Sequence, residues 1–267
     1  MKKYIYFHVC CINNWKEIVG NIWYQIKDSG LYHEVDEIRC SVIGNVQDFK
    51  AFMNNDTKIN IVFSSDEFKY MANNWNPNRR PVHNEQIILN RLYEDAQTED
   101  FYALYLHSKG VKRNKLLYVW NEESEKEYNR QEEAINSWVD FMLYFSVYRY
   151  EKVFSLLEEN DTTGVNLYHF ESASDQHPPG YSYNGNFWWA KSSYIKKLNK
   201  DIGSKYCGPE WWITSGDGKF VSMYYSICDL YQVVFHRKEY ENKPLMLLQA
   251  TSDIIKFNTE RSILCGN

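Results

Sequence analysis

The stretch GYSYNGNFWWAKSSYIKKL, residues 180–198, combines aromatic and amide side chains that could hold a ligand. Trp188 and Trp189 follow an Asn-Gly-Asn turn at residues 184–186. Aromatic rings with a polar edge suit surfaces that are partly apolar and partly wet, such as those that bind sugars. The aromatic share of the whole chain, 17% with 22 Tyr and 9 Trp, points the same way. An ordinary aromatic core is the alternative explanation.

Composition and missing motifs exclude several common binding chemistries. With 30 Lys and Arg against 35 Asp and Glu, the net charge of -5 does not suit a general nucleic-acid binder. The chain reads CCINNW after its first predicted strand and contains no G-x-x-x-x-G-K, so the dinucleotide and P-loop fingerprints are both missing. The six cysteines show no C-x-x-C pair and no zinc-like spacing, which predicts reduced, buried thiols.

Four β-rich runs alternate with helical periodicity in the first half of the chain. The runs are YIYFHVC, EIRCSVIG, KINIVFSS and FYALYLHS, which begin at residues 4, 37, 58 and 101. Strands that alternate with helices predict a mostly parallel α/β sheet whose ligand lies at the carboxyl ends of the strands. Those ends are Cys11–Asn14, the loop after Ile43, Ser64–Asp66 and His107–Gly110.

The second half is less regular. Residues 121–133, NEESEKEYNRQEE, form a charged run that is typical of a solvated face or a mobile loop. A long amphipathic helix is predicted from Ile135 to Leu157, and GVNLYHF at 164–170 is a further strand. Because no linker and no repeat is found, we expect a single domain over residues 1–267, with one half at about 1–120 and a second at about 121–267.

Targeting signals were sought at both ends of the chain. The apolar run of MKKYIYFHVCC is too short for a signal peptide, and no window approaches the length of a membrane span. We therefore expect a cytoplasmic protein. The segment from Pro244 onward has apolar clusters that are expected to cap the core, with a dimer contact or a peripheral membrane contact as alternatives.

Three stretches in order, YALYLHSKGV, GYSYNGNFWWAKSSYIKKL and GPEWWITS, resemble sugar-nucleotide glycosyltransferases of the GT-A fold. The resemblance covers roughly residues 4–240 and points to bacterial and giant-virus enzymes that build surface polysaccharides. It implies a Rossmann-like, mostly parallel sheet flanked by helices. It also implies transfer of a sugar from a nucleoside diphosphate, UDP favoured, to a hydroxyl of a glycan or lipid-linked glycan acceptor.

The resemblance implies acceptor and sugar contacts at the Asn-Gly-Asn turn. Asn184 and Asn186, on either side of Gly185, would bond to sugar hydroxyls. Either Trp188 or Trp189 would offer a ring face to the sugar, since neighbours on a strand point to opposite sides. The alternative is that both tryptophans belong to the core.

The resemblance also implies a general base. Glu210 in GPEWW would take the proton of the attacking hydroxyl in an inverting transfer. Trp211 stands where related enzymes carry a second acid, so Glu210 would act alone or Asp217 would substitute. The alternative is a carboxylate that merely stabilises a helix start, because Pro209 is typical of a first turn.

For the donor diphosphate, related enzymes usually carry Asp-x-Asp, which this chain lacks. The corresponding strand end reads His107-Ser108-Lys109, and a lysine ammonium can offset phosphate charge. We therefore expect a metal-independent or weakly metal-dependent transferase. The alternative is a Mn²⁺ or Mg²⁺ site supplied by Asp66 and His236.

Further donor contacts are expected at the other strand ends and before the third helix. Asn13 and Asp66 would meet the base or ribose, and Arg79, Arg80 and Glu85 would meet the ribose and phosphates. Two other functions stay open from sequence. A non-catalytic glycan-binding module on a degenerate transferase fold would also lack Asp-x-Asp, and a nucleotidyltransferase would want a carboxylate pair and a Gly-rich loop that are missing here.

Overall fold

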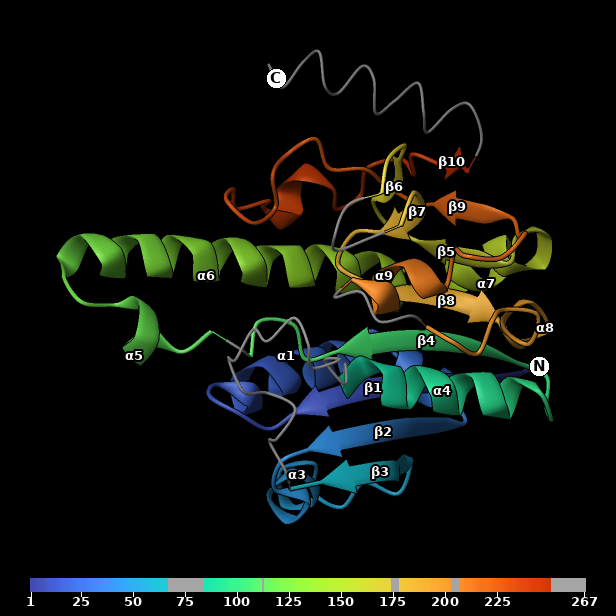
Figure 1. Cartoon of the computed structure of the whole chain (residues 1–267), viewed down its shortest axis with the longest axis horizontal. Coiled ribbons are helices and arrows are strands. Elements are labelled where there is room, and N and C mark those ends of the chain that lie inside the picture. The colour runs from blue at the N-terminus through green and yellow to red at the C-terminus, as the bar shows by residue number, and fades with distance from the viewer. Residues whose placement is uncertain (67–83, 112, 174–177, 203–206, 251–267) are drawn as a thin grey trace.

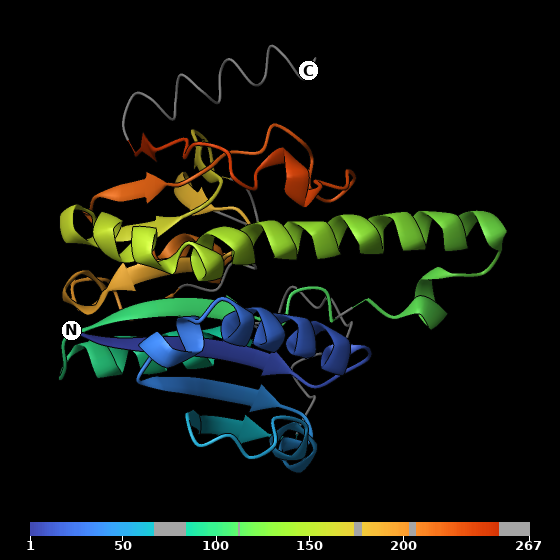
Figure 2. The ribbon, with the colours of Figure 1, turned by 180° about the vertical axis from the view of Figure 1, so that it is seen from behind.

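The computed structural model describes residues 1–66, 84–111, 113–173, 178–202 and 207–250. Its centre is one sheet of eight strands in the order β10-β9-β5-β8-β4-β1-β2-β3, so strands from both halves of the chain share the sheet (Figure 1). Helix α4 covers one face, and α1 and α7 cover the other, as the view from behind also shows (Figure 2). The prediction of an α/β protein with a mostly parallel sheet flanked by helices is confirmed.

The first four strands form the parallel part of the sheet. They are β1 (Lys2–Cys10), β2 (Glu37–Ile43), β3 (Ile59–Ser65) and β4 (Phe101–His107). β2 and β4 pair in parallel with opposite sides of β1, and β3 pairs in parallel with β2. The strand order therefore reverses between β1 and β4. In open α/β sheets, ligands bind outside the carboxyl ends of the strands at such a reversal.

In the described residues, four helices connect these strands. They are α1 (Trp15–Asp28), α2 (Leu31–Glu34), α3 (Val46–Phe52) and α4 (Asn84–Ala96). The apolar residues at helical spacing in the sequence form the buried face of α1. The Asn45 side chain caps α3 by accepting hydrogen bonds from two backbone N–H groups. The strand and helix alternation of this half is confirmed.

The other half of the sheet contains an antiparallel strand. β8 (Trp188–Lys191) runs antiparallel to both β4 and β5 (Thr162–Gly164). β9 (Phe220–Ser222) is parallel to β5, and β10 (Leu248–Gln249) is antiparallel to β9. Two antiparallel steps restore the original direction, so β5 and β9 point the same way as β4.

The single strand predicted at 164–170 is wrong. Only Gly164 belongs to β5, and β6 (Leu167–Phe170) pairs with β7 (Gly180–Tyr183) in a separate two-stranded sheet. Between the two strands Asn166 adopts a φ of 49°, which turns the chain out of the main sheet.

The predicted long helix is also broken. α6 (Glu122–Leu143) passes into a π-helical turn at Tyr144–Tyr148 and then α7 (Tyr150–Glu159). The Ser146 carbonyl in that turn accepts the indole N–H of a strand β8 tryptophan at 2.8 Å, which ties the break to the sheet. The described part of the chain also contains α5 (Lys115–Tyr118), α8 (Ser192–Ile195), α9 (Gly208–Trp212) and a 3₁₀ turn at Arg237–Glu239.

The charged run at 121–133 is helical rather than a loop. Asn121 and Ser124 form a capping box at the start of α6, which satisfies the first N–H groups of the helix. The start of α6 projects beyond the sheet with α5 beside it (Figures 1 and 2). We call residues 113–133 the arm. None of the helices in the described part of the chain combines the length and apolarity that crossing a membrane requires.

A buried ionic network holds α4 to the sheet, away from the carboxyl ends of the strands. The Arg39 guanidinium, with a side chain only 9% exposed, pairs with Glu37, Asp95 and Glu99. It also donates to the hydroxyl of Tyr6 at 2.8 Å. Because Asp95 lies on α4 and Arg39 on β2, the network joins two elements of the first half.

We expect Arg39→Met to lower the free energy of unfolding by about 3–5 kcal/mol, because it leaves a buried carboxylate without its main partner. Denaturant unfolding followed by circular dichroism measures the loss. Lys200→Met is the matched control, since it breaks an exposed pair with Glu94 whose two side chains are 58% and 56% exposed. That pair is expected to contribute less than about 1 kcal/mol. Equal losses in the two variants would contradict the prediction.

Candidate functional site

The loops that follow β1 and β4 are tied together by side chains. The Cys10 N–H donates to Ser108 Oγ at 3.0 Å, and the Ser108 N–H donates to the His8 carbonyl at 3.0 Å. The Asn13 amide donates to the Val111 carbonyl at 2.6 Å. Ser108 is buried, and its hydroxyl holds the two strand ends together, so its role as a donor ligand stays a prediction. Asn13 is exposed, and its contact also joins the two loops.

Glu85, in the first turn of α4, is the centre of the hydrogen bonds at the end of β4. Its Oε2 accepts the Tyr105 hydroxyl at 2.7 Å and the Asn186 amide at 3.0 Å. His107 Nδ1 lies 3.8 Å from the same oxygen. Tyr105 and His107 are two residues apart on β4, so both face α4. The Glu85 side chain is 29% exposed.

The Asn-Gly-Asn turn orients Asn186 toward Glu85. The Asn186 N–H donates to the Tyr183 carbonyl at 3.0 Å, and Gly185 at the second central position has a φ of 98°. Asn186 is 1% exposed, and its Oδ1 accepts the Trp188 indole N–H at 2.8 Å. The predicted contact of Asn186 with a sugar is therefore wrong, because the amide is used inside the protein. Asn184 is half-buried at the first central position of the turn.

Both tryptophans of the FWWA stretch belong to the core. Trp188 and Trp189 are each 0% exposed and lie on opposite faces of the sheet, as the alternation predicts. Trp188 stacks on Tyr105 with ring centroids 5.1 Å apart, whereas Trp189 packs edge-on against Phe154. The prediction that one of them offers a ring face to a sugar is wrong, because β8 lies inside the sheet and helices cover both of its faces.

Gly185→Ala is expected to lower the free energy of unfolding by about 2–4 kcal/mol, through backbone strain and overpacking together. An added Cβ would lie 2.3 Å from Met142 Sδ and 3.1 Å from the Trp138 ring. Gly180→Ala is the matched control, since Gly180 has a φ of 129° but open space around the added Cβ. Thermal unfolding of both variants separates strain from crowding. Similar losses would show that crowding against Met142 and Trp138 has no part.

Glu210 stands in the first turn of α9, after Pro209, as the sequence predicts. The flanking Trp211 and Trp212 are 7% and 3% exposed, so they anchor this short helix. α9 packs against β7 and α4, and Ser182 Oγ donates to the Glu210 carbonyl at 3.3 Å. The two tryptophans thus fix the backbone that carries a half-buried carboxylate.

Charges show that Glu85, Glu210 and Lys109 share one region. Burial first, and then the charges of Glu210 and Glu85, raise the pKa of the Cys207 thiol to about 11, whereas Lys109 opposes them. Burial and the same two carboxylates raise the pKa of Tyr105 well above its ordinary value. The structure therefore gathers these predicted residues, with His107, at the carboxyl end of β4.

The ammonium of Lys109 is held between aromatic rings. Its Nζ lies 4.0 Å from the centroid of the Trp138 ring and 5.7 Å from that of Tyr231, and the two rings meet edge-on. A cation over a ring face is attracted by the ring quadrupole. Trp138 thus fixes the position of Lys109, one of the cations that the sequence assigned to the donor phosphates.

Sequence reasoning missed three residues of this site. Tyr105 could have been found, because it lies two positions before His107 on a predicted strand. Cys207 was counted only as a buried thiol, although it stands three residues before Glu210. Trp138 was assigned to the core, and no local signal connects it to Lys109, which lies 29 positions earlier in the chain.

Asp217 lies at the opposite end of the strands from Glu210. It is exposed and precedes β9, which is parallel to β5 and points the same way as β4, so the residue belongs to the amino ends of these strands. Its charge acts on Tyr194 together with that of Asp161, which precedes β5. The prediction that Asp217 substitutes for a catalytic acid is therefore wrong.

The two residues of the alternative metal site lie far apart. Asp66 is exposed after β3, the edge strand, whereas His236 lies next to a segment that packs on α6 through the hydrogen bond from the Phe235 N–H to Ser137. These segments lie at opposite ends of the molecule (Figures 1 and 2). Within the described ranges, no group of three or more His, Cys, Asp or Glu residues is arranged to hold a metal ion. Arg79 and Arg80 lie outside the described residues.

The arrangement combines a proton acceptor with a fixed cation at the reversal point of a parallel sheet. Glu85 and Glu210 can accept protons, or hydrogen bonds from hydroxyl groups. Lys109 can offset negative charge on a leaving group. Such a set suits displacement reactions in which a hydroxyl attacks and an anion leaves. Neither a scan against protein-family models nor a search of curated proteins finds a match to this chain.

Proposed function

We propose that this protein is a glycosyltransferase that moves a sugar from a nucleoside diphosphate, UDP favoured, to a hydroxyl of a glycan acceptor with inversion. The observation that carries the proposal is the convergence of Glu85, His107, Lys109 and Glu210 at the carboxyl end of β4. This is the point of the sheet where the strand order reverses and ligands bind in open α/β folds.

In the proposed reaction, the oxygen of the acceptor hydroxyl attacks the anomeric carbon of the donor sugar. The bond from that carbon to the diphosphate oxygen breaks, and the nucleoside diphosphate leaves with the electron pair. Glu210 takes the hydroxyl proton as general base. Lys109, whose ammonium lies over the Trp138 ring, would offset the charge that develops on the leaving diphosphate.

Glu85 has a supporting role in this proposal. Donors from Tyr105 and Asn186 hold its carboxylate in one orientation, and that carboxylate in turn lies beside the imidazole of His107. The carboxylate can accept a hydrogen bond from a hydroxyl of the donor sugar. The Asn-Gly-Asn turn therefore positions Glu85 through Asn186, while Asn184 remains the predicted contact of the turn with the acceptor.

A thermal-shift screen of UDP-, GDP-, dTDP- and CMP-sugars, with and without manganese, tests the proposal. A ligand that binds only the native state raises its stability by about 2.7 kcal/mol at a hundred times its Kd. We expect stabilisation by one nucleotide family, followed by slow nucleotide release with water as the acceptor. Stabilisation without manganese would support the role of Lys109.

Two outcomes would contradict parts of the proposal. If no donor stabilised the protein or was hydrolysed, the transferase would be wrong and a glycan-binding module would be the better explanation. If nucleotide release stopped in chelator and returned with manganese, a metal ion rather than Lys109 alone would offset the charge on the leaving group.

A further inference from the structure

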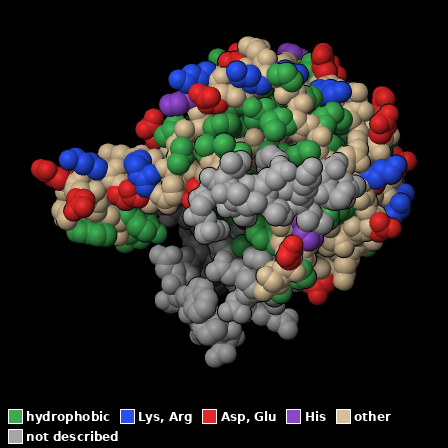
Figure 3. Space-filling model, turned by 90° about the horizontal axis from the view of Figure 1, so that it is seen from above, with side chains coloured by type: hydrophobic (Ala, Val, Ile, Leu, Met, Phe, Trp, Pro, Cys, Tyr) green, Lys and Arg blue, Asp and Glu red, His purple; other side chains and the backbone are tan. Residues whose placement is uncertain are grey.

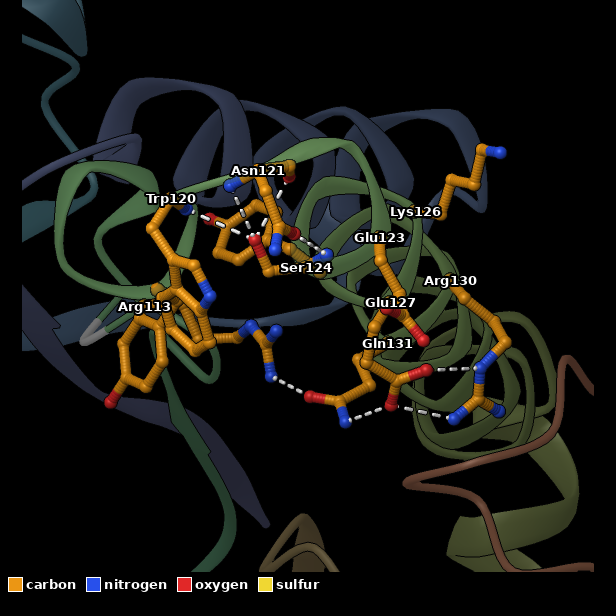
Figure 4. Close-up of a pocket in the computed structure, with 11 residues that line it drawn as sticks. Arg113, Trp120, Asn121, Glu123, Ser124, Lys126, Glu127, Arg130 and Gln131 are labelled. Atoms are coloured by element: carbon orange, nitrogen blue, oxygen red, sulfur yellow. Dashed lines mark hydrogen bonds and ion pairs between the residues drawn. The ribbon is translucent and has the colours of Figure 1, made fainter.

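The arm carries a groove that the site at the strand ends does not use. The groove has a volume of about 610 Å³ and lies between the α5 segment and the first turns of α6 (Figure 4). Its size is within the range of pockets that hold small organic ligands, about 300–1,000 Å³. Three of its eleven lining residues are aromatic, and the other eight are polar or charged.

The groove begins where the candidate site ends. The chain runs from the end of β4 through Gly110 into Arg113, whose N–H donates to the Gly110 carbonyl at 3.0 Å. Arg113 is also the first residue of the groove lining. β1 and β4 point toward the side of the molecule from which the arm projects (Figures 1 and 2). A chain-like ligand could therefore extend from the strand ends along the arm.

The aromatic wall of the groove is open to solvent. Trp120 is 77% exposed and Tyr118 is 52% exposed, whereas Tyr128 is buried beneath the Arg113 guanidinium, 4.8 Å from its ring centroid. Exposed apolar surface that is contiguous and rimmed by polar residues marks interaction sites. The two outer rings offer flat apolar faces of the kind that stack on the C–H side of a sugar.

The polar wall is already ordered. Arg113 donates to Gln131 at 2.9 Å, Gln131 donates to Glu127, and Arg130 pairs with Glu127 through two bonds, which form one connected row (Figure 4). An ordered row loses little side-chain entropy when a ligand binds. Hydroxyl groups can bond to such a row because they both donate and accept.

The charges of the groove favour a neutral ligand. Glu123 and Glu127 offset two of the three positive charges of Arg113, Lys126 and Arg130, which leaves a surplus of one. Basic and acidic side chains are also mixed along the arm (Figure 3). A polyphosphate or a nucleic acid would need a larger surplus of cations. A neutral ligand that presents many hydroxyls and some apolar C–H faces is a carbohydrate.

We infer that the groove binds the sugar chain of the acceptor, beyond the sugar whose hydroxyl reacts. This inference rests on the proposed transferase, because it takes the bound chain to be the acceptor. The arm would then select acceptors by their distal sugars, while the strand-end site performs the transfer.

A lipid surface is the competing occupant of the arm. Leu116 and Leu117 on α5 are 89% and 62% exposed, but neither lines the groove. Insertion of the arm into a bilayer would bury the eight polar and charged residues of the groove, each at a cost unless it is paired. The groove therefore favours a carbohydrate, and the two leucines provide a control.

The test begins with the full chain on an array of plant, animal and bacterial oligosaccharides. The strongest glycan that binds is then titrated into protein carrying ¹⁵N-labelled tryptophan, and the indole N–H signals are followed by NMR. Trp120→Phe assigns the signal of Trp120. We expect that signal to shift on addition of the glycan, and it requires neither donor nor turnover.

Three variants give the sharpest comparison. Trp120→Ala and Tyr118→Ala are expected to weaken glycan binding at least about tenfold, since aromatic anchors dominate binding energy. Both residues are exposed, so neither variant should alter folding. Leu116→Ala, on the same arm but outside the groove, is expected to bind as the wild type does.

The outcomes separate this inference from the proposed function. If the protein hydrolysed a nucleotide sugar but no array glycan shifted Trp120, the groove inference would fail and the transferase would stand. If a glycan shifted Trp120 but no donor was hydrolysed, the groove would stand as a carbohydrate site without the transferase. A shift caused only by phosphatidylcholine vesicles, lost in Leu116→Ala, would overturn the inference in favour of a membrane contact.

Discussion

Glu210→Gln is expected to lower the turnover number for sugar transfer by about 10²- to 10⁴-fold, the usual contribution of a positioned general base. Glutamine keeps the shape of the side chain but cannot accept the proton of the attacking hydroxyl. The fold around it should persist, because Trp211, Trp212 and the Ser182 bond to the backbone carbonyl hold α9. Nucleotide release in the presence of saturating donor and acceptor measures the effect.

Asp217→Asn is the matched control for this prediction. It removes one carboxylate from an exposed residue at the opposite end of the strands. Turnover is therefore expected to stay near that of the wild type. Both variants should unfold within a degree or two of the wild type in a thermal scan, which separates chemistry from stability. A Glu210→Gln variant that kept more than a tenth of the turnover would remove Glu210 from the role of base.

The parallel half of the fold is predictable because its signals are local. Each strand from β1 to β4 is a short β-rich run bounded by a helix with regular apolar spacing, and such units close on their neighbours in the chain. The strand end at His107–Lys109 follows from that pattern alone. The helical structure of the charged run at 121–133 also had a local signal, since Asn121 and Ser124 stand at the spacing of a capping box.

The rest of the site depends on contacts that lie far apart in the sequence. Alternation predicts that Trp188 and Trp189 face opposite ways, but not that β8 lies between β4 and β5 with both faces covered. Asp217 is only seven residues from Glu210, yet the intervening turn carries the chain to the opposite end of the strands. Asn186 meets Glu85 across 101 positions, and no pattern within one segment reveals that contact.

The tyrosines make the protein sensitive to alkaline pH. Tyr6, Tyr105, Tyr183, Tyr194 and Tyr225 are each at most 3% exposed, and burial raises the pKa of every one of these hydroxyls above its ordinary value. In the unfolded chain these groups ionise near pH 10. Above that pH the unfolded state loses protons that the native state keeps, so stability falls as pH rises.

We therefore expect cooperative unfolding within one or two pH units above pH 10. Above pH 10, each buried tyrosine lowers the free energy of unfolding by about 1.4 kcal/mol per pH unit. Five tyrosines lower it by about 7 kcal/mol per pH unit, against a total of about 5–15 kcal/mol. Far-ultraviolet circular dichroism and tyrosinate absorbance should change together, because these rings ionise only when the core opens. Tyr194→Phe should make the loss of stability with pH shallower, whereas Tyr24→Phe, at a residue 63% exposed, should leave it unchanged. Ionisation of all 22 tyrosines near pH 10 with native dichroism retained would mean that burial does not protect these hydroxyls, and would contradict the packing of both faces of the sheet.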